Sequence, residues 1–127
     1  MTTVIFACIH NAGRSQMAAA WFNALADASQ ARAISAGTDP GDCVHPIVVE
    51  AMREIGIDIS GHRSKSVDEF TGQTFDHVIT VCDHAAETCP VFPAGHRLHW
   101  PFEDPKDLAD FRRVRDQMRE RIQGWTP

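Results

Sequence analysis

The sequence predicts an α/β fold, in which helices cover both faces of a parallel sheet. Three short apolar runs are typical of buried strands: residues 3–8 (TVIFAC), 31–35 (ARAIS) and 77–82 (HVITVC). Helix-like stretches alternate with these runs along the chain, and this alternation indicates parallel strands joined by crossover helices. In such sheets ligands bind beyond the carboxyl ends of the strands, so the residues that follow each strand are the first candidates for a site.

The first helix is expected over residues 14–28, where Met17, Trp21 and Leu25 recur at helical spacing. Gly37 and the turn cluster at residues 38–41 end the second strand.

A second helix is expected over residues 45–55, with Pro46 in its first turn and Gly56 after its end. A helical turn near residues 67–70 precedes the third strand. The chain then runs through a fourth strand (97–100) to a terminal helix (108–125).

Composition limits the possible functions of these 127 residues, which we expect to form one domain over 1–127. Twelve Lys and Arg against seventeen Asp and Glu give a net charge of −5, which argues against nucleic-acid binding. No apolar run reaches the roughly 18 residues of a membrane span, and the N-terminus lacks the pattern of a secretory signal. We therefore expect a cytoplasmic monomer, in which four cysteines serve catalysis, redox chemistry or metal binding.

The strongest motif follows the first strand: Cys8, five residues, then Arg14 and Ser15 at the start of a helix. Backbone N–H groups of such a loop bind anions, and the Arg14 guanidinium suits a tetrahedral oxyanion. The same positive field is expected to lower the pKa of Cys8 and keep it as a nucleophilic thiolate. The predicted substrate-binding residues are Ile9, His10, Asn11, Ala12, Gly13, Arg14 and Ser15. Of these, Asn11 and Ser15 can bond the sulfur or brace the loop, and His10 is expected to face solvent.

The segment VIFACIHNAGRSQMAAAW resembles the opening of the low-molecular-weight protein tyrosine phosphatase superfamily, and within it the arsenate reductases. The resemblance continues through ISAGT, IDISGHRS, VITVCD and HWPFEDP, and so covers nearly the whole chain. It implies a three-layer αβα fold with a four-stranded parallel sheet in the order 2-1-3-4.

The resemblance also implies a general acid at Asp104, which precedes Pro105 in the family's Asp-Pro position. A phosphatase of this family usually carries aromatic residues directly after that pair, but here Lys106 and Asp107 follow. This departure favours arsenate reduction, and a phosphatase that uses Cys8, Arg14 and Asp104 is the alternative.

In similar arsenate reductases, a cysteine pair matching Cys82 and Cys89 completes the reaction. The resemblance implies three reaction steps. Cys8 attacks arsenate, a Cys8–Cys82 disulfide forms, and this is converted to a Cys82–Cys89 disulfide that thioredoxin reduces. The resemblance also implies that no cofactor is bound and that the reductant is external, with thioredoxin favoured over glutaredoxin or a small thiol. Phosphate and sulfate are expected to compete with arsenate, and Cys43 has no motif around it.

Two further interpretations concern metals. Cys82, Cys89, His96 and His99 form a possible zinc set, although structural zinc sites usually have closer cysteines. Some thioredoxin-linked arsenate reductases hold potassium between acidic residues that match Ala19 and Lys65 here. Because a lysine ammonium can take the place of that cation, we expect no metal and little dependence on potassium.

The terminal helix carries five arginines interleaved with acidic residues. Arg112 and Asp116 are four residues apart, a spacing typical of ion pairs on a solvated helix face.

Overall fold

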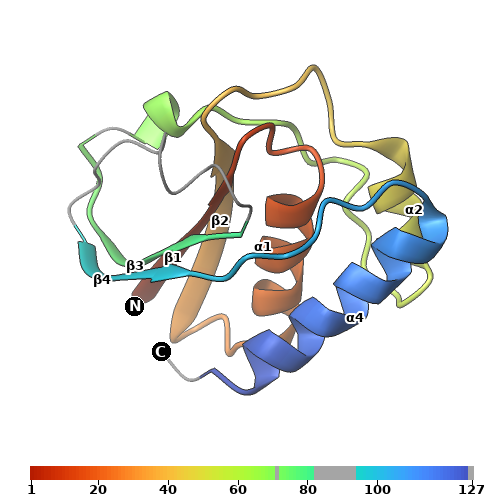
Figure 1. Cartoon of the computed structure of the whole chain (residues 1–127). Helices are drawn as coiled ribbons and strands as arrows, with labels where there is room; N and C mark the ends of the chain where they lie inside the picture. Colours follow the sequence, from red (N-terminus) through yellow and green to blue (C-terminus); the bar gives the residue numbers. More distant parts are fainter. Residues whose placement is uncertain (71, 82–93, 126–127) are drawn as a thin grey trace.

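The computed structural model describes residues 1–70, 72–81 and 94–125. Its sheet has four parallel strands in the order β2-β1-β3-β4, so the predicted fold class is confirmed (Figure 1). The strands are β1 (Thr2–Cys8), β2 (Ala31–Gly37), β3 (Phe75–Thr80) and β4 (Ala94–His99).

The helical elements are α1 (Arg14–Leu25), α2 (Pro46–Arg53), the 3-10 turn η1 (Val67–Phe70) and α4 (Leu108–Gln123). Helix α1 ends three residues earlier than predicted, because Ala26 adopts an extended conformation with φ −85° and ψ 154°. Strand β3 ends at Thr80, two residues before the predicted end at Cys82. None of the helices in the described part of the chain is long and apolar enough to cross a membrane.

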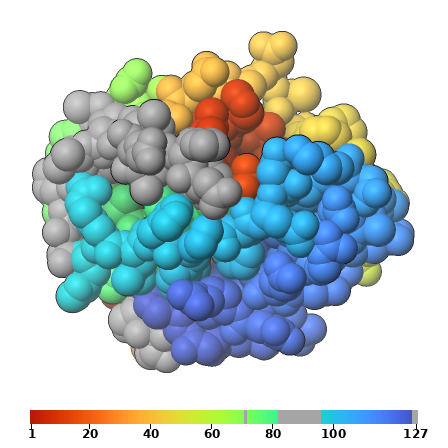
Figure 2. All heavy atoms as spheres, in the orientation of Figure 1, coloured from red at the N-terminus to blue at the C-terminus, as the bar shows by residue number. Residues whose placement is uncertain are grey.

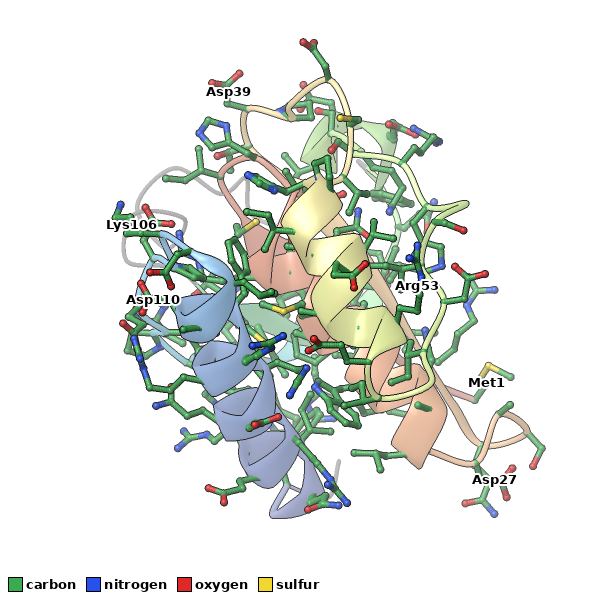
Figure 3. The ribbon with its side chains drawn as sticks, turned by 90° about the vertical axis from the view of Figure 1, so that its right-hand side faces the viewer. Met1, Asp27, Asp39, Arg53, Lys106 and Asp110 are labelled. Atoms are coloured by element: carbon green, nitrogen blue, oxygen red, sulfur yellow. The ribbon has the colours of Figure 1, made fainter. Side chains whose placement is uncertain are left out.

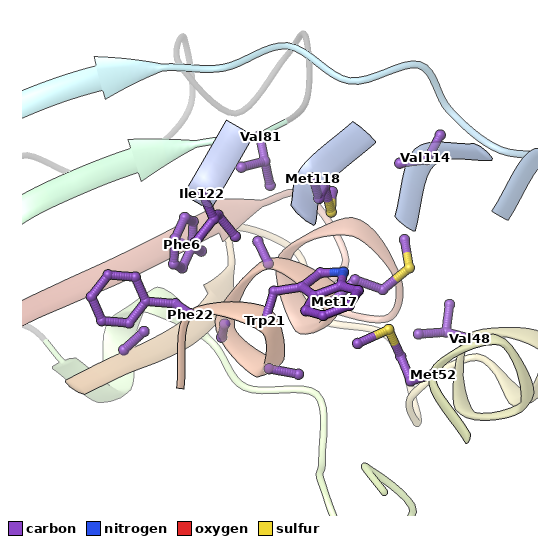
Figure 4. Packing of buried hydrophobic residues seen from close by; sticks show 14 of the residues in the cluster. Phe6, Met17, Trp21, Phe22, Val48, Met52, Val81, Val114, Met118 and Ile122 are labelled. Carbon is purple, nitrogen blue, oxygen red and sulfur yellow. The ribbon is translucent and has the colours of Figure 1, made fainter. Parts of the chain in front are cut away.

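The central strand β1 is buried on both faces, as its continuous apolar run predicts. Phe6 packs on one face into the large core cluster, which includes Met17 and Trp21 of α1 and Met118 of α4 (Figure 4). Ile5 points to the other face, where a smaller cluster joins it to Val67 of η1. Both faces of β1 are thus covered, and this fixes the carboxyl end of the strand, where Cys8 lies.

Helices α2 and α4 lie side by side, and a buried arginine joins them (Figure 3). Arg115 is only 8% exposed, and it donates hydrogen bonds to the Ala51 carbonyl at 2.8 Å and to Glu54 at 2.9 Å. Arg112 also bonds Glu54, at 2.5–3.2 Å, rather than the Asp116 that lies four residues along α4. The expectation of a fully solvated arginine face is therefore wrong for Arg115, since spacing along one helix does not reveal a partner on another.

We predict that Glu54→Gln flattens the acid limb of the stability curve. Hydrogen bonding from Arg112, assisted by Arg115, lowers the pKa of the Glu54 carboxyl from 4.5 to about 2. A carboxyl whose pKa is lowered by folding adds stability above its ordinary pKa, and that stability is lost as the pH falls towards the folded value. Urea unfolding of the wild type should therefore show a free energy that declines between about pH 4.5 and about pH 2, and the variant should lose less over that window.

The matched control is Glu120→Gln, which changes an exposed carboxylate on α4. Equal acid limbs for the wild type and Glu54→Gln would contradict the role assigned to Glu54.

Candidate active site

A cavity of about 330 Å³ opens at the carboxyl end of β1. Seven of the predicted site residues line it: Cys8, Ile9, His10, Ala12, Gly13, Arg14 and Asp104. Figure 2 shows the red-orange segment that follows β1 reaching the surface between the yellow-orange segment after β2 and the light-blue segment before α4. The structure thus brings the Cys8–Ser15 loop and the Asp-Pro segment to one site.

The direction of the peptide groups makes the Cys8–Ser15 loop an anion site. The carbonyls of Cys8, Ile9, His10 and Ala12 accept hydrogen bonds from four backbone N–H groups of residues 38–45, at 2.7–3.1 Å. In a planar trans peptide the C=O and the following N–H point in opposite directions. The N–H groups that follow these carbonyls therefore point away from residues 38–45, as an anion-binding loop requires.

Asn11 is the fully buried centre of this loop, and its φ of 50° lies in the left-handed region that asparagine tolerates. Its backbone N–H donates to the Cys8 sulfur at 3.2 Å. Its side-chain oxygen accepts from Gln16 and from the backbone N–H of Lys65, each at 2.9 Å. Asn11 thus ties the loop to α1 and to the segment before η1.

Ser15 and Asn11 both contact the Cys8 sulfur, and the backbone N–H of Asn11 donates to it. The Ser15 hydroxyl oxygen lies 2.8 Å from the sulfur and accepts a hydrogen bond from the Asn11 side-chain amide at 2.7 Å. When Cys8 is a thiolate it has no hydrogen to donate, so the Ser15 hydroxyl is then the donor to the sulfur. Two donors aimed at one sulfur stabilise the thiolate over the thiol.

Arg14 links the loop to the segment that carries the predicted acid. Its guanidinium donates to the Phe102 carbonyl at 2.8 Å and lies 3.8 Å from a carboxylate oxygen of Asp104. The other carboxylate oxygen of Asp104 accepts from Lys106 at 3.0 Å. Asp104 therefore lies at the cavity between two cations.

The neighbouring acid, Glu103, is directed elsewhere. It accepts two hydrogen bonds from Arg113 of α4, at 2.7 and 2.9 Å, and does not line the cavity. Of these two adjacent acids, Asp104 therefore lines the cavity and Glu103 does not.

Residues 3–127 match the family described as low molecular weight phosphotyrosine protein phosphatase. The chain belongs to this family.

Curated and solved proteins that resemble the chain include arsenate reductases, and a low molecular weight protein tyrosine phosphatase of T. tengcongensis superposes with a TM-score of 0.79 at 26% identity, covering 97% of this chain and 96% of the other. The arsenate reductase of Halalkalibacterium halodurans is 42% identical over 94% of this chain and 91% of its own length. A solved structure of an arsenate reductase in its oxidised state superposes with a TM-score of 0.85 at 34% identity, covering 98% of this chain and 95% of the other. A thioredoxin-dependent arsenate reductase of Corynebacterium glutamicum superposes with a TM-score of 0.81 at 32% identity, covering 98% of this chain and 59% of the other.

Cys82 and Cys89, the two cysteines predicted to act after Cys8, lie outside the described residues. Cys43 is exposed on the segment before α2 and does not line the cavity.

Part of the possible zinc set lies on β4. His96 and His99 are three residues apart on this strand, so their side chains project to opposite faces. His96 stacks on His77, whereas a ring nitrogen of His99 bonds the Thr80 hydroxyl. These two histidines cannot hold one ion between them, and no group of three metal-binding side chains occurs among the described residues.

The residues that match the potassium position of some family members do not fit that cation. The Lys65 ammonium lies 3.4 Å from the Ser35 hydroxyl and 3.3 Å from the Arg63 carbonyl. Burial lowers the pKa of Lys65, and the nearby Arg63 lowers it further. Ala19 has no acidic side chain, so the two matching positions carry a methyl group and an amino group in place of two acids.

Sequence reasoning missed several residues that shape the site. Gln16 is 1% exposed and bonds Asn11 and the Arg63 carbonyl, and its only signal was its place directly after Ser15. His45 and Lys106 line the cavity, but neither belongs to a motif with a known spacing. Gly37 was interpreted only as the end of a strand, although the backbone of the Cys8–Ser15 loop passes directly over it.

We predict that Gly37→Ala disrupts the anion site. A Cβ atom at Gly37 would lie 2.5 Å from the Ile9 carbonyl oxygen and 2.9 Å from the Asn11 nitrogen, and both are backbone atoms. Overpacking of this kind costs about 1–3 kcal/mol of folding free energy, and here the backbone that moves is that of the loop. Urea unfolding and calorimetric titration with phosphate should show lower stability and lost binding.

Gly61→Ala is the matched control, because a Cβ atom at Gly61 meets nothing within 4 Å. Normal phosphate binding by Gly37→Ala would contradict the close approach as the constraint on the loop.

We predict that potassium has little effect on this protein. Since Lys65 stands where the resemblance places an acidic potassium ligand, and its ammonium lies beside the Ser35 hydroxyl and the Arg63 carbonyl, thermal unfolding should have the same midpoint in potassium chloride as in sodium chloride of equal concentration. A marked rise that is specific to potassium would show that the ammonium does not replace the cation.

Proposed function

We propose that this protein reduces arsenate to arsenite, with Cys8 as the nucleophile. The observation that carries the proposal is the buried Cys8 sulfur, which lines a cavity together with Arg14 and Asp104 and receives hydrogen bonds from the loop. The arsenate reductases at 32–42% identity support it.

The first step forms a bond between the Cys8 sulfur and arsenic. The thiolate attacks As(V) while the loop N–H groups and Arg14 neutralise the oxyanion. One arsenic–oxygen bond breaks, and Asp104 supplies a proton so that this oxygen leaves as water. Cys8 remains joined to As(V), and no electrons have yet moved to arsenic.

The second step transfers two electrons. The Cys82 thiolate attacks the Cys8 sulfur, the sulfur–arsenic bond breaks, and its electron pair stays on arsenic as As(III). A Cys8–Cys82 disulfide forms and arsenite leaves. Cys89 then attacks Cys82, which releases the Cys8 thiolate and leaves a Cys82–Cys89 disulfide for thioredoxin to reduce.

A backbone hydrogen bond supports the participation of Cys82. Val81 is the last described residue before Cys82, and it donates its N–H to the Ala7 carbonyl at 3.0 Å. Ala7 directly precedes Cys8, so the two chain segments lie side by side up to these cysteines.

A phosphatase is the second candidate function, because Cys8, Arg14 and Asp104 also form the minimal set for that reaction. Lys106 stands against it as the main activity. This exposed cation lines the cavity and is bound to Asp104, at the place where the family's phosphatases usually carry an aromatic residue.

We predict arsenate-dependent oxidation of NADPH when the protein is mixed with thioredoxin and thioredoxin reductase. Cys82→Ser should abolish this turnover, because arsenic then has no second thiol to supply electrons. The same variant should keep any hydrolysis of p-nitrophenyl phosphate, which Cys8→Ser should lose.

Cys43→Ser is the control and should reduce arsenate normally, because Cys43 does not line the cavity. Full arsenate turnover by Cys82→Ser would defeat the proposed relay. Turnover with glutathione and glutaredoxin but not with thioredoxin would reassign the reductant.

A further inference from the structure

Two histidines line the cavity around Cys8, and their hydrogen-bond partners assign them opposite chemistry. His10 belongs to the Cys8–Ser15 loop, and His45 precedes α2. A neutral imidazole has one nitrogen that donates and one that accepts, and the partner of one nitrogen fixes the role of the other.

The partner of His10 is a backbone carbonyl. Its Nδ1 atom lies 2.9 Å from the carbonyl oxygen of Asp39. A carbonyl oxygen only accepts, so Nδ1 carries the hydrogen. The Nε2 atom of the neutral ring therefore has a lone pair, and the exposed His10 is an acceptor among the residues that line the cavity.

The partner of His45 is a backbone N–H. Its Nδ1 atom accepts from the N–H of Ile47 at 3.2 Å, which caps the start of α2. The hydrogen of the neutral ring is therefore on Nε2, and the ring packs on Phe111 with centroids 5.6 Å apart. His45 thus offers the cavity a donor.

The other polar groups of the cavity do not duplicate the role of His10. Arg14 and Lys106 only donate, as do the loop N–H groups. Asp104 also accepts, but its carboxylate is charged and faces the cations Arg14 and Lys106. Among the described lining side chains, Nε2 of His10 is thus the neutral acceptor.

We propose that His10 makes this cavity select oxyanions that carry a hydroxyl group, and so distinguishes arsenate and phosphate from sulfate. This inference rests on the proposed function, in that it assumes an oxyanion bound over Cys8. Arsenate and phosphate keep at least one hydroxyl at neutral pH, and that hydroxyl can donate to Nε2 of His10. Sulfate has no hydrogen to donate, so an oxygen of sulfate that faces Nε2 would meet its lone pair with repulsion and without a hydrogen bond.

The test measures how well phosphate and sulfate protect Cys8 from alkylation by iodoacetamide at slightly alkaline pH. Alkylation of each cysteine is read by peptide mass spectrometry, with the exposed Cys43 as internal reference. We expect phosphate to protect Cys8 at an about tenfold or more lower concentration than sulfate, since one satisfied hydrogen bond is worth about that factor.

Two variants of His10 separate its chemistry from its bond to Asp39. His10→Ala removes the acceptor and should bring the two protection constants to within about threefold. His10→Lys puts donors in the place of the acceptor and should favour sulfate further. The matched control is His45→Asn, because asparagine also caps helices. The loss of the imidazole with its Nε2–H should weaken both anions by the same factor and leave their ratio unchanged.

The outcomes are distinct. An unchanged ratio in both His10 variants, or an equal loss of both anions, would overturn the role of His10 and leave the proposed function standing. Absence of protection by either anion in the wild type would overturn the oxyanion site itself. A ratio that depends on His10 in a protein without arsenate turnover would support the selectivity and reject the reductase.

Discussion

The outward direction of the carbonyl groups in the Cys8–Ser15 loop is the constraint on which the site depends. Residues 38–45 bond the carbonyls of Cys8, Ile9, His10 and Ala12. The carbonyl between these, that of Asn11, accepts from Gln16 and Ser64. With every carbonyl from residue 8 to residue 12 held by an outside donor, the intervening N–H groups must turn the other way. Because the N–H donors are already oriented before an anion binds, the loop loses little conformational entropy on binding.

The sheet order explains why such distant segments meet at this loop. Strand β1 lies between β2 and β3, and the carboxyl ends of parallel strands lie at one edge of the sheet. The segment after β2 therefore passes beside the loop, and it approaches so closely that only a glycine fits at position 37. The segment before η1 reaches the loop from behind, where Lys65 bonds Asn11. Both supporting segments thus lie on the β2 side of β1, because the segment that carries Lys65 bonds and bridges to Gly37 at the end of β2.

The features that could be predicted from the sequence are those that depend on residues close together in the chain. The apolar run of β1, the Cys8–Arg14 spacing and the helix that starts at Arg14 are all visible in consecutive residues. The burial of Arg115 was not predictable, because its partner Glu54 is 61 residues away and spacing within α4 favoured a solvated pair. The ring orientation of His10 likewise depends on Asp39, which only the fold brings to it. The strand order was predicted from the resemblance to the family, because the alternation of strands and helices alone does not determine it.

The pairing of acids around the cavity explains how a chain with a net charge of −5 can hold an oxyanion. Asp110 and Glu103 both bond Arg113, which directs their charge towards α4. Asp104 is the acid that reaches the cavity, and Arg14 and Lys106 flank its carboxylate. Electrostatic interaction falls off over about 8–10 Å at physiological salt, so these nearby pairs outweigh the net charge of the molecule. The anion therefore meets a local excess of donors and cations, and the overall acidity of the chain does not oppose its binding.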